Sequence, residues 1–325
     1  MKKGIIAALL LMCGVMAGTS ASHAEATWPT KPIRLVIPFP PGGGTDILSR
    51  IVANEVSQNT KWTFLPDNKP GAGGVIGIAD VVKAAPTGYD IVMGQKDNVV
   101  VAPWVNKSVT YDPRRDLVTI AHVAYIPLVI VTPSHSPYKS FQDLVAAARK
   151  APGTITYASP GNGTTAHLAA EIIGKAAGIK LLHVPYKGSN AALVDTMAGN
   201  VNLMISSVPS ALAQIKSGKV RAMAVTSAAR SSALPEVPTV AESGYKQVDV
   251  TTWYGLFAPA KTPKEIVERI GVEVNKALAK PAVVQAIKEQ GAEAKSMSQA
   301  EFSKLVQSDY LKWKDIVKAS GATVE

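Results

Sequence analysis

The sequence predicts an α/β protein made of two lobes that face each other across a cleft, each lobe a mostly parallel sheet flanked by helices. Short apolar runs of strand length alternate with amphipathic stretches of helical period, which is the pattern of βαβ units. The order strand, glycine-rich loop, helix occurs in both halves of the chain. With 325 residues, the chain is also long enough for two domains.

The first glycine-rich loop organises the N-terminal half. Residues 33–37 form an apolar, β-branched run of strand length, and prolines stop it before the glycines at 42–44. Apolar residues at helical spacing follow, so we expect a helix capped by Thr45 or Asp46. Glycines allow a ligand to approach the backbone, and the unpaired N–H groups of a helix N-terminus suit an anion. A tight turn without a ligand is the alternative.

The same plan continues through the first half. We expect a strand over residues 61–67, a second glycine loop over 68–74, a helix over 75–84 and a strand over 89–93. Strands of consecutive βαβ units run parallel, so both loops should lie at the carboxyl edge of one sheet, where open α/β sheets bind ligands. Gln95, Asp97 and Asn98 should lie at that edge too.

The second half repeats the plan and ends in helices. After a long apolar segment at 119–131, interrupted at Pro127, the pattern predicts helices over 141–150 and 191–198 and strands over 154–158, 181–184, 201–205, 220–226 and 250–259. Three last helices, over 263–279, 281–289 and 299–319, should return to the first lobe. Lobe 1 is therefore expected over residues 25–126 plus 249–325 and lobe 2 over 127–248, with links near 125–128 and 247–252.

The first 24 residues differ from the rest. Two lysines precede a short apolar run, and small and polar residues end at Ala24, which is typical of a secretory signal peptide. Cys13, the only cysteine, lies in this leader, and Met12 stands where a lipid-anchored form needs a small residue. We therefore expect a soluble, secreted mature protein without disulfides or thiolate metal sites.

The charge of the chain is basic. Removing the leader leaves 32 basic against 24 acidic residues, a net charge of +8, which favours anionic partners. The basic residues are scattered, without a basic helix or an alternation of basic and aromatic residues. A role with nucleic acid is therefore not supported.

Polar side chains gather after the strand at 154–158. Ser159, Thr164 and Thr165 carry hydroxyl donors, and His167 lies one helical turn after Thr164. If no ligand binds here, Thr164 is simply a helix N-cap and His167 a partly buried helix residue.

Two further positions carry the same ambiguity. Ser206 and Ser207 follow the strand at 201–205 at the equivalent edge, or they simply begin a helix. Phe39 and the pair Trp253-Tyr254 are expected in the core or the cleft wall rather than in a cofactor site.

Catalytic and cofactor patterns are weak. Residues 161–166 match G-x-G-x-x-A, but His183 and Val184 stand where a dinucleotide site needs an acidic residue. The sequence has no G-x-S-x-G elbow and no H-E-x-x-H pair, and its other histidines are isolated. We expect no catalytic residue, no cofactor and no metal.

The chain resembles the Bug-type periplasmic solute receptors of tripartite tricarboxylate transporters. The motifs that carry the resemblance span the mature chain in order: residues 28–46, 69–74, 157–168, 184–188, 195 within ALVDTMAGN, 220–226, 238–244 and 253–259. The resemblance implies a type II periplasmic-binding-protein fold, a Venus flytrap that closes on one small carboxylate without chemistry and passes it to membrane transporter subunits as a monomer.

The resemblance also places the ligand between the two lobes. It assigns one carboxylate to the first glycine loop, partly through ordered water, with the loop of the second lobe opposite. Together with the edge positions above, the expected ligand-binding residues are Phe39, Gly42, Gly43, Gly44, Thr45, Asp46, Gln95, Asn98, Ser159, Gly163, Thr164, Thr165, His167, Ser206 and Ser207.

Two positions depart from the family pattern. Asn202 stands where an aspartate is expected, and residues 95–98 replace small and hydroxyl residues. Lys96 would favour a second negative group on the ligand and Asp97 an ammonium group. The alternatives to a transport receptor are a ligand-sensing module and a secreted α/β enzyme acting on an acidic substrate.

Overall fold

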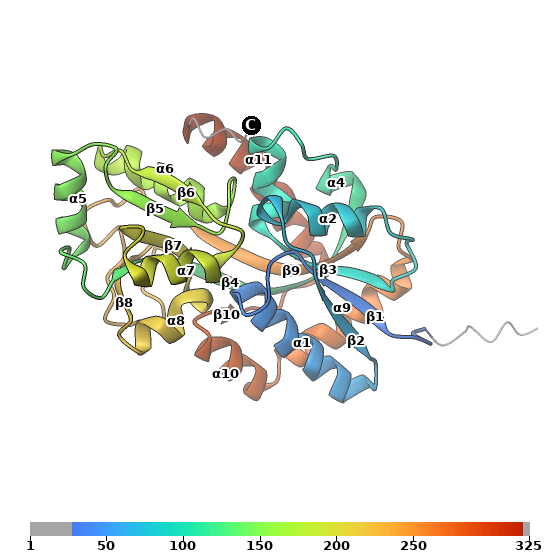
Figure 1. The fold of residues 1–325 in the computed structure, drawn as a ribbon. Helices are drawn as coiled ribbons and strands as arrows, with labels where there is room; N and C mark the ends of the chain where they lie inside the picture. The colour runs from blue at the N-terminus through green and yellow to red at the C-terminus, as the bar shows by residue number, and fades with distance from the viewer. Residues whose placement is uncertain (1–27, 321–325) are drawn as a thin grey trace, which may run out of the picture.

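The computed structural model describes residues 28–320, so the predicted leader and Cys13 lie outside the described residues. Figure 1 shows two lobes side by side, with the strands β4 (Leu117–Pro133) and β9 (Thr251–Pro259) running between them. The α/β, two-lobed fold class predicted from the sequence is confirmed.

The first lobe is built on a parallel group of three strands. β1 (Ile33–Ile37) lies between β2 (Phe64–Asn68) and β3 (Asp90–Gln95), and both pairings are parallel. On the far side of β3 the sheet continues with β9 and β4, both antiparallel to their neighbours. The short β10 (Glu293–Ala294) pairs antiparallel with β4. The βαβ reading of the first half is therefore confirmed.

Helices cover this sheet because their apolar faces fit it. α1 (Gly44–Thr60) and α9 (Lys264–Leu278) pack on one face, where Leu48 and Val52 of α1 share a core cluster with Ile270 and Val274 of α9. α10 (Pro281–Glu289) joins that layer, while η1 (Ala72–Gly74) and α2 (Val75–Val82) follow β2.

The second lobe repeats the parallel triplet. β5 (Thr156–Ser159) lies between β6 (Leu182–Pro185) and β7 (Leu203–Ser207), again with parallel pairing. β7 and β8 (Val220–Val225) pair antiparallel with the end of β4. The flanking helices are α5 (Phe141–Lys150), α6 (Thr165–Ala177), α7 (Ser189–Ala198) and α8 (Val208–Lys216).

β4 belongs to both lobes. Its residues 117–127 pair with β9, and residues 128–133 pair with β7 and β8. The apolar segment around Pro127 is thus one continuous strand. Its pairing partners change near the proline, from β9 before it to β7 and β8 after it.

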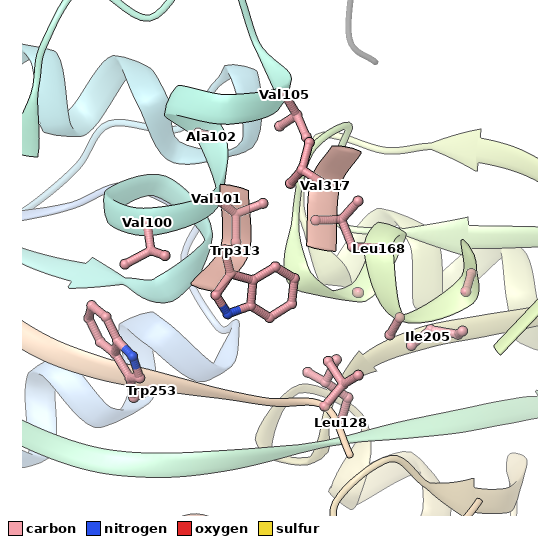
Figure 2. Packing of buried hydrophobic residues seen from close by; sticks show 14 of the residues in the cluster. Val100, Val101, Ala102, Val105, Leu128, Leu168, Ile205, Trp253, Trp313 and Val317 are labelled. Atoms are coloured by element: carbon pink, nitrogen blue, oxygen red, sulfur yellow. The ribbon is translucent and has the colours of Figure 1, made fainter. Parts of the chain in front are cut away.

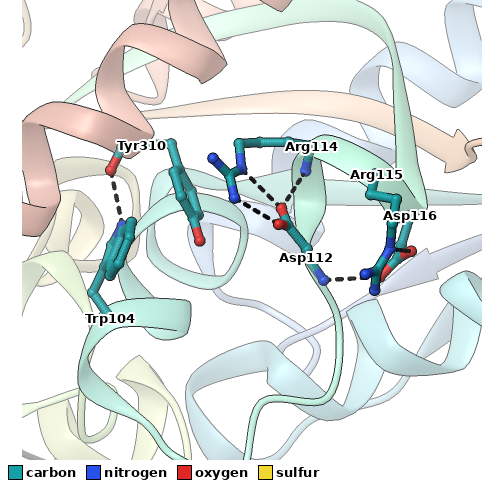
Figure 3. A network of polar contacts seen from close by, with 6 residues as sticks. All are labelled: Trp104, Asp112, Arg114, Arg115, Asp116 and Tyr310. Carbon is teal, nitrogen blue, oxygen red and sulfur yellow. Dashed lines mark hydrogen bonds and ion pairs between the residues drawn. The ribbon is translucent and has the colours of Figure 1, made fainter.

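The C-terminal helix α11 (Gln299–Ser320) is fastened to the first lobe. The indole Nε1 of Trp104, in α3 (Ala102–Val105), donates to the backbone oxygen of Tyr310 at 2.8 Å. The guanidinium of Arg114, in α4 (Pro113–Asp116), lies 4.4 Å from the centre of the Tyr310 ring and is held by Asp112 at 2.7 Å (Figure 3). The last helix therefore contacts α3 and α4 of the first lobe.

α11 also reaches the second lobe. Trp313 and Val317 lie in one apolar cluster with Leu168 of α6 and Leu128 of β4 (Figure 2). The cluster includes η2 (Lys96–Val101), a π-helical turn that directly follows β3. This core therefore crosses from one lobe to the other beside the strands that link them.

One local prediction is wrong. The N-cap of α1 is Gly43, without a side-chain cap, rather than Thr45 or Asp46. The Thr45 hydroxyl instead accepts a hydrogen bond from Gln95 Nε2, and the Asp46 carboxylate accepts from Gly42 N at 3.0 Å and from Arg50 at 2.9 Å. Asp46 also accepts from Asn68 Nδ2 at 3.0 Å, so both side chains have tertiary partners that compete with capping.

Candidate functional site

A small cavity of about 30 Å³ lies where the two lobes meet. Its wall in the first lobe comes from the first glycine loop and the edge of the sheet: Phe39, Pro40, Gly43, Gly44, Thr45, Gln95, Asp97 and Tyr254. The second lobe contributes Pro160, Ala166, Ser189, Asn190, Ser207 and Ser210, and the linking strands contribute Leu128 and Thr252.

The N-terminus of α1 forms part of the wall of this cavity. A helix leaves its first N–H groups without intrahelical partners, and Gly43, Gly44 and Thr45 line the wall at that end. Burial raises the pKa of Tyr254 to about 12, so its hydroxyl remains a neutral donor beside Ser207 and Thr45. Backbone donors, hydroxyls and the positive end of the helix dipole together suit a carboxylate.

The lobes touch each other around the cavity. Gly44 N of the first lobe donates to Ser210 Oγ of the second at 3.1 Å. Asn190 Nδ2 donates to the backbone oxygen of Pro41 at 2.8 Å. These bonds join residues 149 and 166 positions apart, so they exist only while the lobes are together. The structure is therefore a closed arrangement.

The second glycine loop faces an outer part of the same cleft. Residues 70–74 lie opposite residues 185–188, around a groove of about 310 Å³ that shares Phe39, Pro40 and Pro160 with the inner cavity. The two glycine loops therefore lie at one edge of the sheet, as the βαβ reading predicts.

The structure brings six of the predicted ligand-binding residues to the cavity wall. They are Phe39, Gly43, Gly44, Thr45, Gln95 and Ser207. Three others of the first lobe, Gly42, Asp46 and Asn98, do not line the cavity. Gly42 N and Asp46 bond to each other, and the side chain of Asn98 is fully buried, with its Oδ1 accepting from Gln95 N at 2.9 Å.

The polar residues of the second-lobe loop are occupied within the protein. Ser159 Oγ lies 2.7 Å from His183 Nε2, and Gly163 N donates to His167 Nδ1 at 3.1 Å. The Thr164 hydroxyl accepts from His167 N at 3.3 Å, so Thr164 is the N-cap of α6. None of these described residues lines the cavity.

The two other hydroxyls predicted in the second lobe also have partners. Thr165 N donates to Asp97 Oδ1 at 3.0 Å. Ser206 Oγ donates to Ser189 Oγ at 3.2 Å, so it supports a residue of the cavity wall. Asn202, the departure from the family pattern, accepts from Thr156 N at 2.8 Å and therefore supports β5.

Several wall residues were not predicted. Ser189 and Asn190 follow β6 at the start of a helix, which is the signal that identified the other loops. Ser210 lies in the first turn of α8 and reaches Gly44 only through the fold. Tyr254, expected in the core or cleft wall, presents its hydroxyl to the cavity.

Stacked histidines lie beneath the second-lobe loop. The ring of His183 stacks on His167 at 4.1 Å and on Tyr157 at 4.7 Å between centroids. Burial lowers the pKa of His167 to about 4, and burial together with the neighbouring His167 lowers the pKa of His183 to about 3. His122, buried against the backbone oxygen of Lys295, has its pKa lowered by burial to about 4.

These histidines predict a loss of stability in mild acid. An unfolded histidine titrates near pH 6.5, so below that pH the unfolded chain binds protons that the folded chain does not. Each of the three should cost about 2 kcal/mol of unfolding free energy between pH 7 and pH 5. Urea denaturation at both pH values measures the loss. A His167→Gln/His183→Gln variant should show a clearly shallower pH dependence; the same slope as the wild type would contradict this assignment.

Neither a metal centre nor a membrane span is found in the part of the chain that the structure describes. Over residues 28–320 no three His, Cys, Asp or Glu side chains gather as a metal site. No helix in that range combines the length and the apolar character that crossing a bilayer requires.

Two lobes that close around a small polar cavity beside shared linking strands define a solute-binding protein. A family model described as "Tripartite tricarboxylate transporter family receptor" matches residues 48–322. Protein BugT of Bordetella pertussis is 33% identical over 98% of both chains. A UPF0065 protein from the tcbD-tcbE intergenic region of Pseudomonas sp. strain P51 is 39% identical over 92% of this chain and 90% of its own. The chain therefore belongs to the tripartite tricarboxylate transporter receptor family.

Solved structures agree with this assignment. The periplasmic binding protein BugD is 33% identical, covers 92% of this chain and all of its own, and superposes with a TM-score of 0.87. R. palustris Rpa4515, solved with adipate, is 31% identical over 91% of this chain and all of its own, with a TM-score of 0.89. MatC from Rhodopseudomonas palustris, with bound malate, is 26% identical over 89% and 99% of the two chains, with a TM-score of 0.84. The family is one of receptors, not enzymes.

Proposed function

We propose that this protein is a periplasmic receptor that captures a small organic carboxylate between its lobes and delivers it to a membrane transporter. The observation that carries the proposal is the N-terminus of α1, which lines the interlobe cavity with Gly43, Gly44 and Thr45. A carboxylate there would accept from backbone N–H groups and from the hydroxyls of Ser207 and Tyr254. The relatives solved with adipate and malate support the same class of ligand.

The remaining features of the receptor belong to the same proposal. The leader at residues 1–24 would direct the chain to the periplasm, where it acts as a monomer. The lobes would divide at residues 126/127, within β4, and at 248/249, just before β9. The predicted site residues that do not line the cavity would act by holding the loops in place.

A thermal-shift screen tests this function. The mature protein, residues 25–325, would be heated with a panel of carboxylates and with the amide of each acid. A ligand that binds the folded form raises the melting temperature as its concentration exceeds the dissociation constant. We expect at least one acid to raise it while its amide does not. A shift with amides alone, or with none of the acids, would contradict the proposal.

A further inference from the structure

Asp97 places a carboxylate of the protein itself in the wall of the ligand cavity. It lies in η2, directly after β3, and only 8% of it is exposed. Its Oδ1 accepts hydrogen bonds from the backbone N and the hydroxyl of Thr165 in the other lobe, the former at 3.0 Å. Burial raises the pKa of Asp97, while the two bonds from Thr165 favour its charged form.

Thr165 is the first residue of α6, so this contact occupies a helix N-terminus. The cavity is thus bounded by two helix N-termini, that of α1 at Gly43–Thr45 and that of α6 at Ala166. Each is a position where an anion is favoured. At α6 that position is already taken by Asp97, which leaves α1 for a carboxylate of the ligand.

The described residues of the inner cavity offer no cation to a second ligand carboxylate, and Lys187 lies in the outer groove. Among the described residues that line the cavity there is no lysine or arginine. Lys96, the neighbour of Asp97, turns away to Asp309, with Nζ 3.2 Å from Oδ2, and donates to the backbone oxygen of Thr251 at 3.0 Å. Arg50, behind the first loop, pairs with Asp46 at 2.9 Å.

We propose that Asp97 makes the site select ligands with a single carboxylate, whose other end is neutral or positively charged, and reject ligands with a second carboxylate. The inference rests on the proposed function and narrows its ligand class. A second ligand carboxylate would lie within a few ångströms of Asp97. Like charges at that distance in a partly dehydrated site repel each other, and the repulsion should lower affinity by roughly ten- to a hundredfold.

Calorimetry with matched pairs of acids tests the selection. The pairs differ only in the second carboxylate: butyrate and succinate, hexanoate and adipate, benzoate and terephthalate, with 4-aminobutyrate as the cationic counterpart. In at least one set the single-carboxylate member should bind the wild type at least tenfold more tightly than the diacid. Asp97→Asn keeps an oxygen that can accept from Thr165. It should reduce the ratio of the two affinities, single-carboxylate acid over diacid, at least tenfold.

A second variant separates charge from lobe contact. Thr165→Val removes the hydroxyl bond to Asp97 but leaves the charge, so both members of a pair should weaken equally. Three results would each overturn the inference. The diacids could bind the wild type as tightly as their single-carboxylate partners, or the affinity ratio of the pair could be unchanged in Asp97→Asn. Thr165→Val could also change that affinity ratio as much as Asp97→Asn does. Failure of every acid to bind would overturn the proposed function itself, whereas a preference for diacids overturns only the selection by Asp97.

Discussion

Gly44→Ala is expected to lower ligand affinity by ten- to a hundredfold, about 1.4–2.7 kcal/mol, without lowering the stability of the free protein. A Cβ at Gly44 would lie 3.0 Å from Ser207 Oγ, 3.1 Å from Pro209 Cβ and 3.2 Å from the Tyr254 hydroxyl. Ser207 and Pro209 belong to the opposite lobe, so the added methyl group crowds the closed arrangement. Closure is what gives the ligand contacts from both lobes, and obstructing it lowers affinity.

The free protein should tolerate this change because Gly44 is the first residue of α1. The backbone at Gly44 is not in the left-handed region, so alanine can adopt its conformation without strain. Affinity would be measured by calorimetry and stability by thermal melting. Gly271→Ala is the matched control: its Cβ would lie 3.1 Å from the backbone oxygen of Ile120 within one lobe. It should lower the melting temperature and leave affinity alone. A Gly44→Ala protein that binds within twofold of the wild type would contradict the closed arrangement.

Asp309→Ala should cost about 3–5 kcal/mol of unfolding free energy, because it leaves a buried lysine without its partner. Asp309 Oδ2 lies 3.2 Å from Lys96 Nζ and accepts from Trp253 Nε1 at 2.8 Å. The two charged side chains are only 9% and 12% exposed. The contact fastens α11 to β9 and η2, next to the core that crosses between the lobes (Figure 2).

The charge explanation has a direct check. Lys96→Met together with Asp309→Leu removes both charges and should recover most of the lost stability in urea denaturation. Glu268→Ala is the comparison, because its pair with Lys264 is 3.5 Å long and exposed. It should change stability by less than about 0.5 kcal/mol. If the double variant is as unstable as Asp309→Ala, an unpaired lysine is not the cause.

Local patterns in the sequence were sufficient for the main strands and most of the long helices, although they did not predict η2 or α8. The apolar run at 33–37 is β1, and the helix predicted at 141–150 is α5, which begins with a capping box of Ser140 and Asp143. Strand length, helical period and glycine position depend on neighbouring residues, so each can be read locally. The same patterns placed the glycine loops at the sheet edge. The cap of α1 could not be predicted this way, because Thr45 and Asp46 form hydrogen bonds with residues that are distant in the chain.

The candidate site was less predictable, because hydroxyl and charged side chains can turn either way at the end of a strand. Ser159 turned inward to His183, while Ser207, in the equivalent position of β7, lines the cavity. Nothing in the local sequence distinguishes the two serines. The difference is made by which partner the packing brings within hydrogen-bond distance.

The sequence by itself determined the family, the βαβ order of both halves and a glycine-rich helix N-terminus suited to an anion. Only the tertiary structure decided which partners Lys96 and Asp97 contact. Lys96 turns to Asp309, 213 positions later, whereas its neighbour Asp97 faces the cavity and reaches α6 of the other lobe. A charge acts on whatever folding places within a few ångströms, and residues so far apart in the chain meet only when both lobes and α11 have assembled.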